Sequence, residues 1–233
     1  MQNIDWNNLK SEDKYYDPNY QELTPDEQRK KHFEMCTRVS RLTGTIEQYD
    51  LSKFEKRPGV SDALTATKQF LTKPQHHFLT FTGAPGTGKT HLAKAIGWQY
   101  VKDLKQVRYW QCQDLLDELK KGFSIFIGDT KTMFDQLMNS VMVVPLLILD
   151  DLGAEKSTAW SEGELRKIID YRYDRKLLTV VTTNASLSQL DERINDRLGE
   201  GEVITMKCSS YRIELARRRH NVFYLPRLRV LDD

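Results

Sequence analysis

The sequence lacks any long apolar run: none approaches the roughly 18 consecutive apolar residues that a membrane-spanning helix requires. It also lacks a signal-peptide pattern, because its first residues, MQNIDWNNLKSEDKYYD, are polar and acidic. Cysteine is scarce, and Cys36, Cys112 and Cys208 form no CxxC pair, which argues against a disulfide framework or a zinc knuckle. These absences predict a soluble, cytoplasmic protein with reduced thiols.

A large net charge of one sign is absent as well. The 35 lysines and arginines nearly balance the 33 acidic residues, and the formal charge of +2 argues against a surface that coats nucleic acid as a whole. The charges are nevertheless unevenly distributed. Residues 1–27 carry seven carboxylates against two lysines and few aliphatic side chains, so this segment cannot build a core of its own.

A helix is predicted from residue 25 onward. Thr24 can cap it, Pro25 fits the first helical position, and Glu27 completes a capping box. Gly44 is expected to end this helix. Its apolar stripe is thin, formed by Phe33, Val39 and Leu42. We therefore expect the helix to pack against another part of the chain.

From about residue 77, short apolar runs alternate with helical stretches. The runs lie at 77–82, 106–111, 145–151, 177–184 and 202–207. In the stretch THLAKAIGWQYVKDLK an apolar side chain recurs at every fourth residue, which is typical of a helix. PLLILD and LLTVVTT are continuously apolar, which implies burial on both faces of a strand. The pattern predicts an α/β fold with a parallel sheet between layers of helices.

The octet GAPGTGKT, residues 83–90, follows the first predicted strand and opens a predicted helix. It matches the phosphate-binding pattern G-x-x-x-x-G-K-S/T, whose glycines let backbone N–H groups approach a phosphate at a helix N-terminus. Lys89 is expected to contact the β- and γ-phosphates of ATP, and Thr90 to hold Mg²⁺. The predicted nucleotide-binding residues are Gly83, Pro85, Gly86, Thr87, Gly88, Lys89, Thr90 and His91.

Two further strands end in polar side chains. PLLILDD ends in Asp150 and Asp151, and a pair of carboxylates at a buried strand end is costly unless it faces a cation. We expect Asp150 to contact Mg²⁺ and Asp151 to act as the general base for an attacking water. Asn184 ends the run LLTVVTTN, where its amide can orient that water or the γ-phosphate.

Together the motifs GAPGTGKTHLA, LLILDDLGAEKSTAW, VVTTN, DERINDRLGEG and SYR resemble the AAA+ ATPases of the DnaC, DnaI and IstB type, over roughly residues 45–215. These are helicase loaders and transposition helper ATPases. The resemblance implies a five-stranded AAA+ core with a minimal or absent lid at residues 46–233, and a short helical partner-binding segment at residues 1–45. By the same resemblance Asn184 is sensor 1.

The resemblance also implies roles for three arginines. Arg197 in NDRLGEG matches the arginine finger that reaches the γ-phosphate bound by a neighbouring subunit, and Arg193, one helical turn earlier, fits this role less well. Arg212 in SYR matches sensor 2. An exposed surface cation is the alternative reading of each arginine.

Two features depart from the family pattern. The acidic pair is Asp-Asp where AAA+ proteins usually have Asp-Glu, so the shorter Asp151 side chain predicts slow turnover, as in a switch. Many relatives also carry a cysteine-rich zinc module before the ATPase domain, whereas this chain has only Cys36 there.

The last residues, YRIELARRRHNVFYLPRLRV, interleave arginines with aromatic side chains. They fit either a track for single-stranded nucleic acid or a solvated basic helix end. The resemblance implies an ATP-dependent, self-associating loader that places a DnaB-type hexameric replicative helicase on single-stranded DNA. An IstB-like transposition helper acting on duplex DNA is the alternative, and a small-molecule P-loop kinase is the third class considered.

Overall fold

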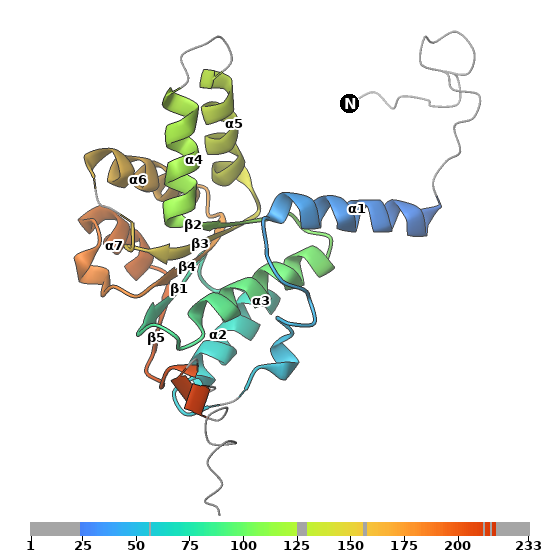
Figure 1. Ribbon diagram of the computed structural model, residues 1–233, viewed down its shortest axis with the longest axis vertical. Coiled ribbons are helices and arrows are strands. Elements are labelled where there is room, and N and C mark those ends of the chain that lie inside the picture. The colour runs from blue at the N-terminus through green and yellow to red at the C-terminus, as the bar shows by residue number, and fades with distance from the viewer. Residues whose placement is uncertain are drawn as a thin grey trace, which may run out of the picture.

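Five parallel strands form one sheet in the order β2-β3-β4-β1-β5 (Figure 1). They are β1 (Phe78–Gly83), β2 (Val107–Gln111), β3 (Leu146–Leu152), β4 (Leu178–Thr183) and β5 (Glu202–Met206). All five apolar runs are therefore strands, with ends that differ from the predicted ones by at most one residue. The computed structural model describes residues 24–55, 57–124, 130–155, 158–211, 213–214 and 216–217.

Helices cover both faces of this sheet (Figure 1). One face carries α1 (Pro25–Ser40), α2 (Ser61–Thr72) and α3 (Lys89–Lys102); the other carries α4 (Cys112–Ser124), α5 (Thr130–Val143), α6 (Ala159–Asp174) and α7 (Glu192–Gly199). The three-layer α/β fold with a helical N-terminal extension is thus confirmed. Among the described residues no lid bundle follows β5, and none of the described helices has the length and apolarity needed to cross a bilayer.

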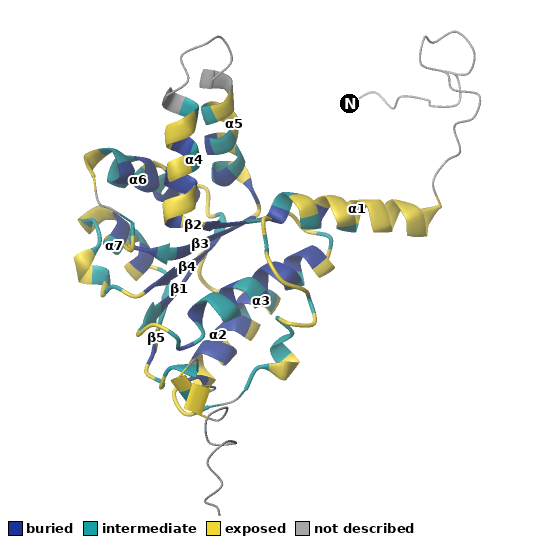
Figure 2. Ribbon diagram, in the orientation of Figure 1, coloured by how far each residue is buried: buried dark blue, intermediate teal, exposed yellow. Residues whose placement is uncertain are grey.

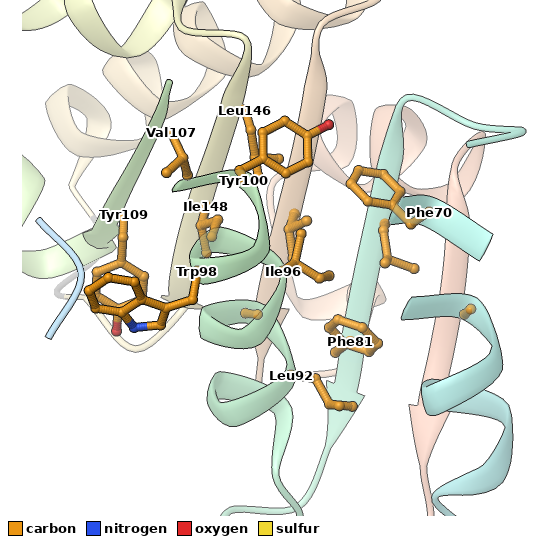
Figure 3. Packing of buried hydrophobic residues seen from close by; sticks show 14 of the residues in the cluster. Phe70, Phe81, Leu92, Ile96, Trp98, Tyr100, Val107, Tyr109, Leu146 and Ile148 are labelled. Carbon is orange, nitrogen blue, oxygen red and sulfur yellow. The ribbon is translucent and has the colours of Figure 1, made fainter. Parts of the chain in front are cut away.

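The continuously apolar strands are buried on both sides, as predicted (Figure 2). In β3 the side chains alternate between two separate cores: Leu146 and Ile148 face α1 to α3, and Leu147 and Leu149 face α4 to α7. Figure 3 shows the first of these cores, where Ile148 lies near Ile96 of α3. Burial of each such side chain contributes about 1.5–3 kcal/mol to the stability of the fold. Burial on both faces fixes the sheet between the helical layers.

Helix α1 begins as predicted but ends earlier. The Thr24 hydroxyl accepts a hydrogen bond from the Glu27 N–H at 3.3 Å, and the Glu27 carboxylate accepts one from the Thr24 N–H at 2.8 Å. The predicted end at Gly44 is wrong, because Ser40 is the last helical residue. The Ser40 hydroxyl accepts a hydrogen bond from Leu42 N–H at 3.1 Å, and Arg41 adopts a left-handed conformation with φ of 59°, which turns the chain out of the helix.

The C-terminal half of α1 packs against α3 and β2, as the thin apolar stripe suggested. Cys36 is fully buried, and the Arg41 guanidinium lies 3.6 Å from the centre of the Trp110 ring. Leu42 lies so close to Gly97 of α3 that a Cβ there would come within 3.0 Å of it. The first half of α1 is exposed and projects from the domain (Figure 2). The domain boundary after residue 45 remains a prediction, and it falls in the segment that follows these contacts.

A fully buried arginine joins the second helical layer to the sheet. Arg172 of α6 donates hydrogen bonds through all three guanidinium nitrogens. Its acceptors are the carbonyls of Val141, Met142 and Val144 at 3.0, 2.9 and 2.9 Å, the Leu178 carbonyl at 2.6 Å and the Thr179 hydroxyl at 2.8 Å. Burial lowers the pKa of Arg172 to about 9, so the side chain still carries its charge at neutral pH. It satisfies the last carbonyls of α5, which the helix itself leaves unpaired.

Replacing Arg172 with methionine should lower the free energy of unfolding by about 3 kcal/mol, because buried carbonyls would lose their donor. Urea denaturation measures the difference. The matched control is Arg175→Met: Arg175 is exposed and stacks on the Tyr171 ring at 3.8 Å, so its replacement should cost only about 0.5 kcal/mol. Equal losses in the two variants would contradict this account of Arg172.

Candidate functional site

The strand order brings the predicted polar residues to one edge of the sheet. Because β4 lies between β1 and β3, the residue that follows β4, Asn184, lies between the loop that follows β1 and the two aspartates of β3. Ligands of such sheets bind outside the carboxyl ends of the strands. A cavity of about 640 Å³ opens at this edge, lined by the P-loop, Asp150, Asp151 and Asn184.

The loop after β1 has the backbone that a phosphate-binding loop needs. Gly83, Gly86 and Gly88 have φ of 135°, 82° and 110°, a region that side chains with a Cβ rarely adopt. Gly86 is also sterically required, because a Cβ there would lie 2.2 Å from the Ser210 hydroxyl. Helix α3 begins directly at Lys89, so the N–H groups of its first turn face the cavity edge. The loop therefore has the shape of an anion cradle.

Lys89 connects this loop to the end of β4. The residue is 6% exposed, and its ammonium donates hydrogen bonds to the carbonyls of Gly83 at 2.6 Å and Ala84 at 2.9 Å. It also donates to Asn184 Oδ1 at 2.7 Å. Two residues predicted separately from the sequence thus meet, and both line the cavity.

Asp150 is buried and its carboxylate accepts three hydrogen bonds. Thr90 donates to Oδ1 at 2.9 Å, Thr182 donates to the same oxygen at 2.6 Å, and Tyr109 donates to Oδ2 at 2.6 Å. The pairing of Thr90 with Asp150 joins the two predicted Mg²⁺ ligands, and a hydroxyl and a carboxylate are oxygen ligands of the kind Mg²⁺ prefers. Among the described residues no group of three or more histidine, cysteine or acidic side chains gathers as a metal site. A P-loop magnesium site needs no such group, because water and phosphate supply its other ligands.

Tyr109 and Thr182 were not predicted from the sequence. Burial raises the pKa of the Tyr109 hydroxyl well above its usual value, and the nearby Asp150 carboxylate adds to the effect. Tyr109 therefore stays protonated and remains a donor. Thr182 stands two residues before Asn184, a spacing that places both on the same side of β4, and this is the signal that could have found it. No comparable spacing connects Tyr109 to Asp150.

Asp151 has a different environment from Asp150. The pairing of β3 with β4 shifts between Leu149 and Leu152, and Asp151 has a φ of 60°, uncommon for a residue with a side chain. Thr182 Oγ1 accepts a hydrogen bond from the Asp151 N–H at 2.9 Å. Asn184 Nδ2 donates to Asp151 Oδ1 at 2.6 Å. The irregular backbone turns this carboxylate toward the cavity instead of into the sheet.

Aromatic side chains form one wall of the cavity. His91 lies between Tyr49 and Phe54, with ring centres 4.9 and 5.2 Å away. Burial, and secondarily the nearby Lys94 ammonium, lowers the pKa of His91. Tyr49 and Phe54 belong to the segment between α1 and α2, which carries no motif, so neither residue could be predicted to line the site.

Arg197 and Arg193, the two candidates for the arginine finger, lie away from this cavity. Arg197 of α7 pairs with Asp170 and Glu200, each at 3.4 Å, and its guanidinium lies 4.1 Å from the centre of the Tyr173 ring. Arg193 pairs with the same Asp170 at 3.0 Å. Neither arginine lines the cavity. Arg212 and most of the basic C-terminal tail lie outside the described residues.

Comparison with known proteins gives one family. Residues 19–216 match the model of the IstB-like ATP binding protein family. The replicative helicase loader DnaC of Buchnera aphidicola subsp. Baizongia pistaciae is 29% identical over 197 residues, which cover 79% of this chain and 78% of the relative. DnaC of Escherichia coli K12 is 29% identical over 162 residues, covering 66% of this chain and 64% of the relative.

Solved structures agree on the fold. A crystal structure of the DnaC helicase loader matches with a TM-score of 0.59 and 29% identity, over 70% of this chain and 98% of that one. The AMPPCP-bound DnaA of Aquifex aeolicus matches with a TM-score of 0.65 over 79% of this chain and 57% of that one. At 20% identity this match shows a shared fold and nothing more.

The lowered pKa of His91 predicts a pH dependence of stability. The contribution of the neutral imidazole is fully present above the unfolded-state pKa of about 6.5 and is lost as the pH falls through the lower folded-state pKa, because the unfolded chain takes up the proton first. His91→Gln should therefore show a smaller loss in free energy of unfolding between pH 7.5 and pH 5 than the wild type. Urea denaturation at both pH values measures this. Parallel losses in the two proteins would contradict the burial of a neutral His91.

Proposed function

The chain belongs to the IstB-like ATP binding protein family, and from that premise we propose that it is an ATP-dependent loader of a replicative hexameric helicase. The observation that carries the proposal is the set of contacts Lys89–Asn184–Asp151 and Thr90–Asp150 in a chain whose relatives are named replicative helicase loader DnaC. The description of the family supports the alternative of an IstB-like transposition helper, but these relatives favour the loader. A small-molecule kinase does not fit membership of this family.

The cavity fits ATP with Mg²⁺. Glycines at positions where a Cβ would collide form the loop, and the N-terminus of α3 faces the phosphates. Lys89 is the cation of the loop, and its present carbonyl acceptors leave it beside the phosphate position. Thr90 and Asp150 would hold Mg²⁺, which neutralises the charge of the β- and γ-phosphates when bound. Tyr109 and Thr182 fix the Asp150 carboxylate for this task.

Asp151 and Asn184 are placed for hydrolysis. Asp151 would take the proton of the attacking water, and its carboxylate is oriented by the amide of Asn184. Because an aspartate reaches one methylene less far than a glutamate, we expect slow turnover. In this proposal Arg197 stabilises the transferring phosphoryl group bound by another copy of the chain, and Arg212 acts as sensor 2 on its own nucleotide.

The proposed partners follow from the ends of the chain and from the relatives. Residues 1–23 bear Trp6, Tyr15, Tyr16 and Tyr20 among acidic side chains, a composition suited to folding upon binding to the helicase. The basic and aromatic C-terminal tail is proposed to contact single-stranded DNA. Both proposed contacts concern residues that lie largely outside the described ranges.

The loader proposal predicts that the chain, with ATP, places a DnaB-type helicase on circular single-stranded DNA that offers no end to thread. Unwinding of a duplex annealed to that circle measures loading. Lys89→Ala should reduce loading about tenfold or more, because the phosphates lose their loop cation. A chain that begins at residue 24 keeps α1 and should lose capture of the helicase. Absence of loading, with preferential binding of duplex DNA and capture of a transposase, would favour the transposition helper instead.

The assignment of Arg197 predicts complementation between two inactive variants. Arg197→Ala should bind ATP nearly normally but lose cooperative hydrolysis, and Lys89→Ala should not hydrolyse ATP. Mixing them creates interfaces in which an intact Lys89 site meets an intact Arg197, so partial ATPase activity should return. Arg166→Ala, which removes an ion pair to Asp191 without touching the cavity, is the control and should behave as wild type. No recovery on mixing would leave Arg197 without this role.

A further inference from the structure

Arg57 joins three segments that are far apart in the sequence. It lies in the segment that joins α1 to α2, here called the linker, and its side chain is 10% exposed. One guanidinium nitrogen, Nη2, donates to the Thr87 carbonyl of the P-loop at 3.3 Å. The other, Nη1, donates to the Ser209 carbonyl of the segment after β5 at 3.1 Å. A single forked side chain thus holds the linker, the P-loop and the C-terminal segment together.

The segment after β5, residues 207–211, lies against the outer side of the P-loop. The Tyr211 N–H donates to the Gly86 carbonyl at 2.9 Å, and the Cys208 thiol donates to the Thr87 carbonyl at 3.5 Å. Ser210 lies against Gly86 with no room for a Cβ between them. These contacts reach the carbonyl side of the loop, whereas its N–H groups are left for phosphate. A shift of the loop must therefore move this segment, or break these bonds.

Most of the Arg57 side chain is withdrawn from solvent, so its charge depends on nearby groups of the protein. The carboxylate paired with it among the described residues is Glu214, at 3.5 Å, and its guanidinium lies 4.8 Å from the centre of the Tyr211 ring. Within the same residues its Nε has no hydrogen-bond partner. Arg57 also lines the cavity that Lys89 lines. Withdrawing most of this cation from water costs free energy. Its hydrogen bonds to the Thr87 and Ser209 carbonyls and its ion pair with Glu214 offset that cost, and they hold the side chain against the loop.

We propose that Arg57 is a positioning residue for the nucleotide, which locks the P-loop against residues 207–211 and couples nucleotide binding to the position of that segment. The inference rests on the proposed function only in requiring that the P-loop binds a nucleotide. By reciprocity, a nucleotide that fixes the loop also fixes the segment, and the segment leads directly into Arg212.

Nucleotide affinity is the first test. Titration with a fluorescent ATP analogue should give an affinity about tenfold weaker for Arg57→Ala than for the wild type, as expected for the loss of hydrogen bonds from a charged donor. Tyr211→Ala should weaken binding less, and the double variant should be no weaker than Arg57→Ala, because the two side chains act as a unit. Arg41→Ala is the matched control: Arg41 also stacks on an aromatic ring but lies outside the cavity, so its affinity should stay within about twofold of the wild type.

Hydrogen exchange separates positioning from a general loss of structure. In the wild type the nucleotide should slow exchange of the Tyr211 amide, which is bonded to the Gly86 carbonyl; in Arg57→Ala this slowing should disappear while the unfolding midpoint stays near that of Arg41→Ala. Arg57→Lys keeps the charge but cannot span the Thr87 and Ser209 carbonyls, and it should behave as Arg57→Ala.

Two results would overturn the inference alone: wild-type affinity in Arg57→Ala, or full rescue of affinity and Tyr211 protection by Arg57→Lys, which would assign only an electrostatic role. A wild-type chain that binds no nucleotide would instead overturn the proposed function and this inference together. The titration of the wild type therefore distinguishes the two failures.

Discussion

The site depends on one amide placed between two opposite charges. Asn184 accepts a hydrogen bond from Lys89 through Oδ1 and donates one to Asp151 through Nδ2. Because the two partners differ in charge, only one orientation of the amide satisfies both. This arrangement requires β4 to lie between β1 and β3, so the strand order of the sheet is what makes the site possible. The Lys89 ammonium and the Asp151 carboxylate are therefore connected through one amide, and a displacement of either group changes the hydrogen bonding of the other.

The two adjacent aspartates of β3, Asp150 and Asp151, have different surroundings. Asp150 is saturated by hydroxyl donors, which fix a carboxylate beside Thr90 and suit it to a metal ion. Asp151 leaves the regular pairing of the sheet, with a backbone conformation that few residues with a side chain adopt, and its carboxylate contacts Asn184. Adjacent residues of the same type thus reach different partners because the backbone turns between them.

Much of the fold could be predicted because it depends on local signals. Short apolar runs identified all five strands, and the glycine pattern located the loop between β1 and α3. What could not be predicted depends on contacts between distant segments. The Tyr109 hydroxyl reaches Asp150 because β2 pairs with β3, and Arg57 meets Thr87 because the linker passes the P-loop. The early end of α1 was also not predicted, and its cause is local. The hydroxyl of Ser40 competes with the helix for backbone groups, so the helix ends before it reaches Gly44.

Arg197 lies away from the cavity that Lys89 and Asp150 line. Its guanidinium is held on α7 by Asp170 and Glu200 and stacks on Tyr173, and it does not line the cavity. The ion pairs also pre-orient the side chain, so its ordering entropy need not be lost again when it meets a phosphate. If this arginine serves a phosphoryl group, that group is bound by another copy, through a contact in which two different surfaces meet. Such contacts propagate into rings or helices and do not close as dimers. Under the proposed function, a site that binds the nucleotide alone and needs a second copy for turnover would make hydrolysis depend on assembly, as a switch requires.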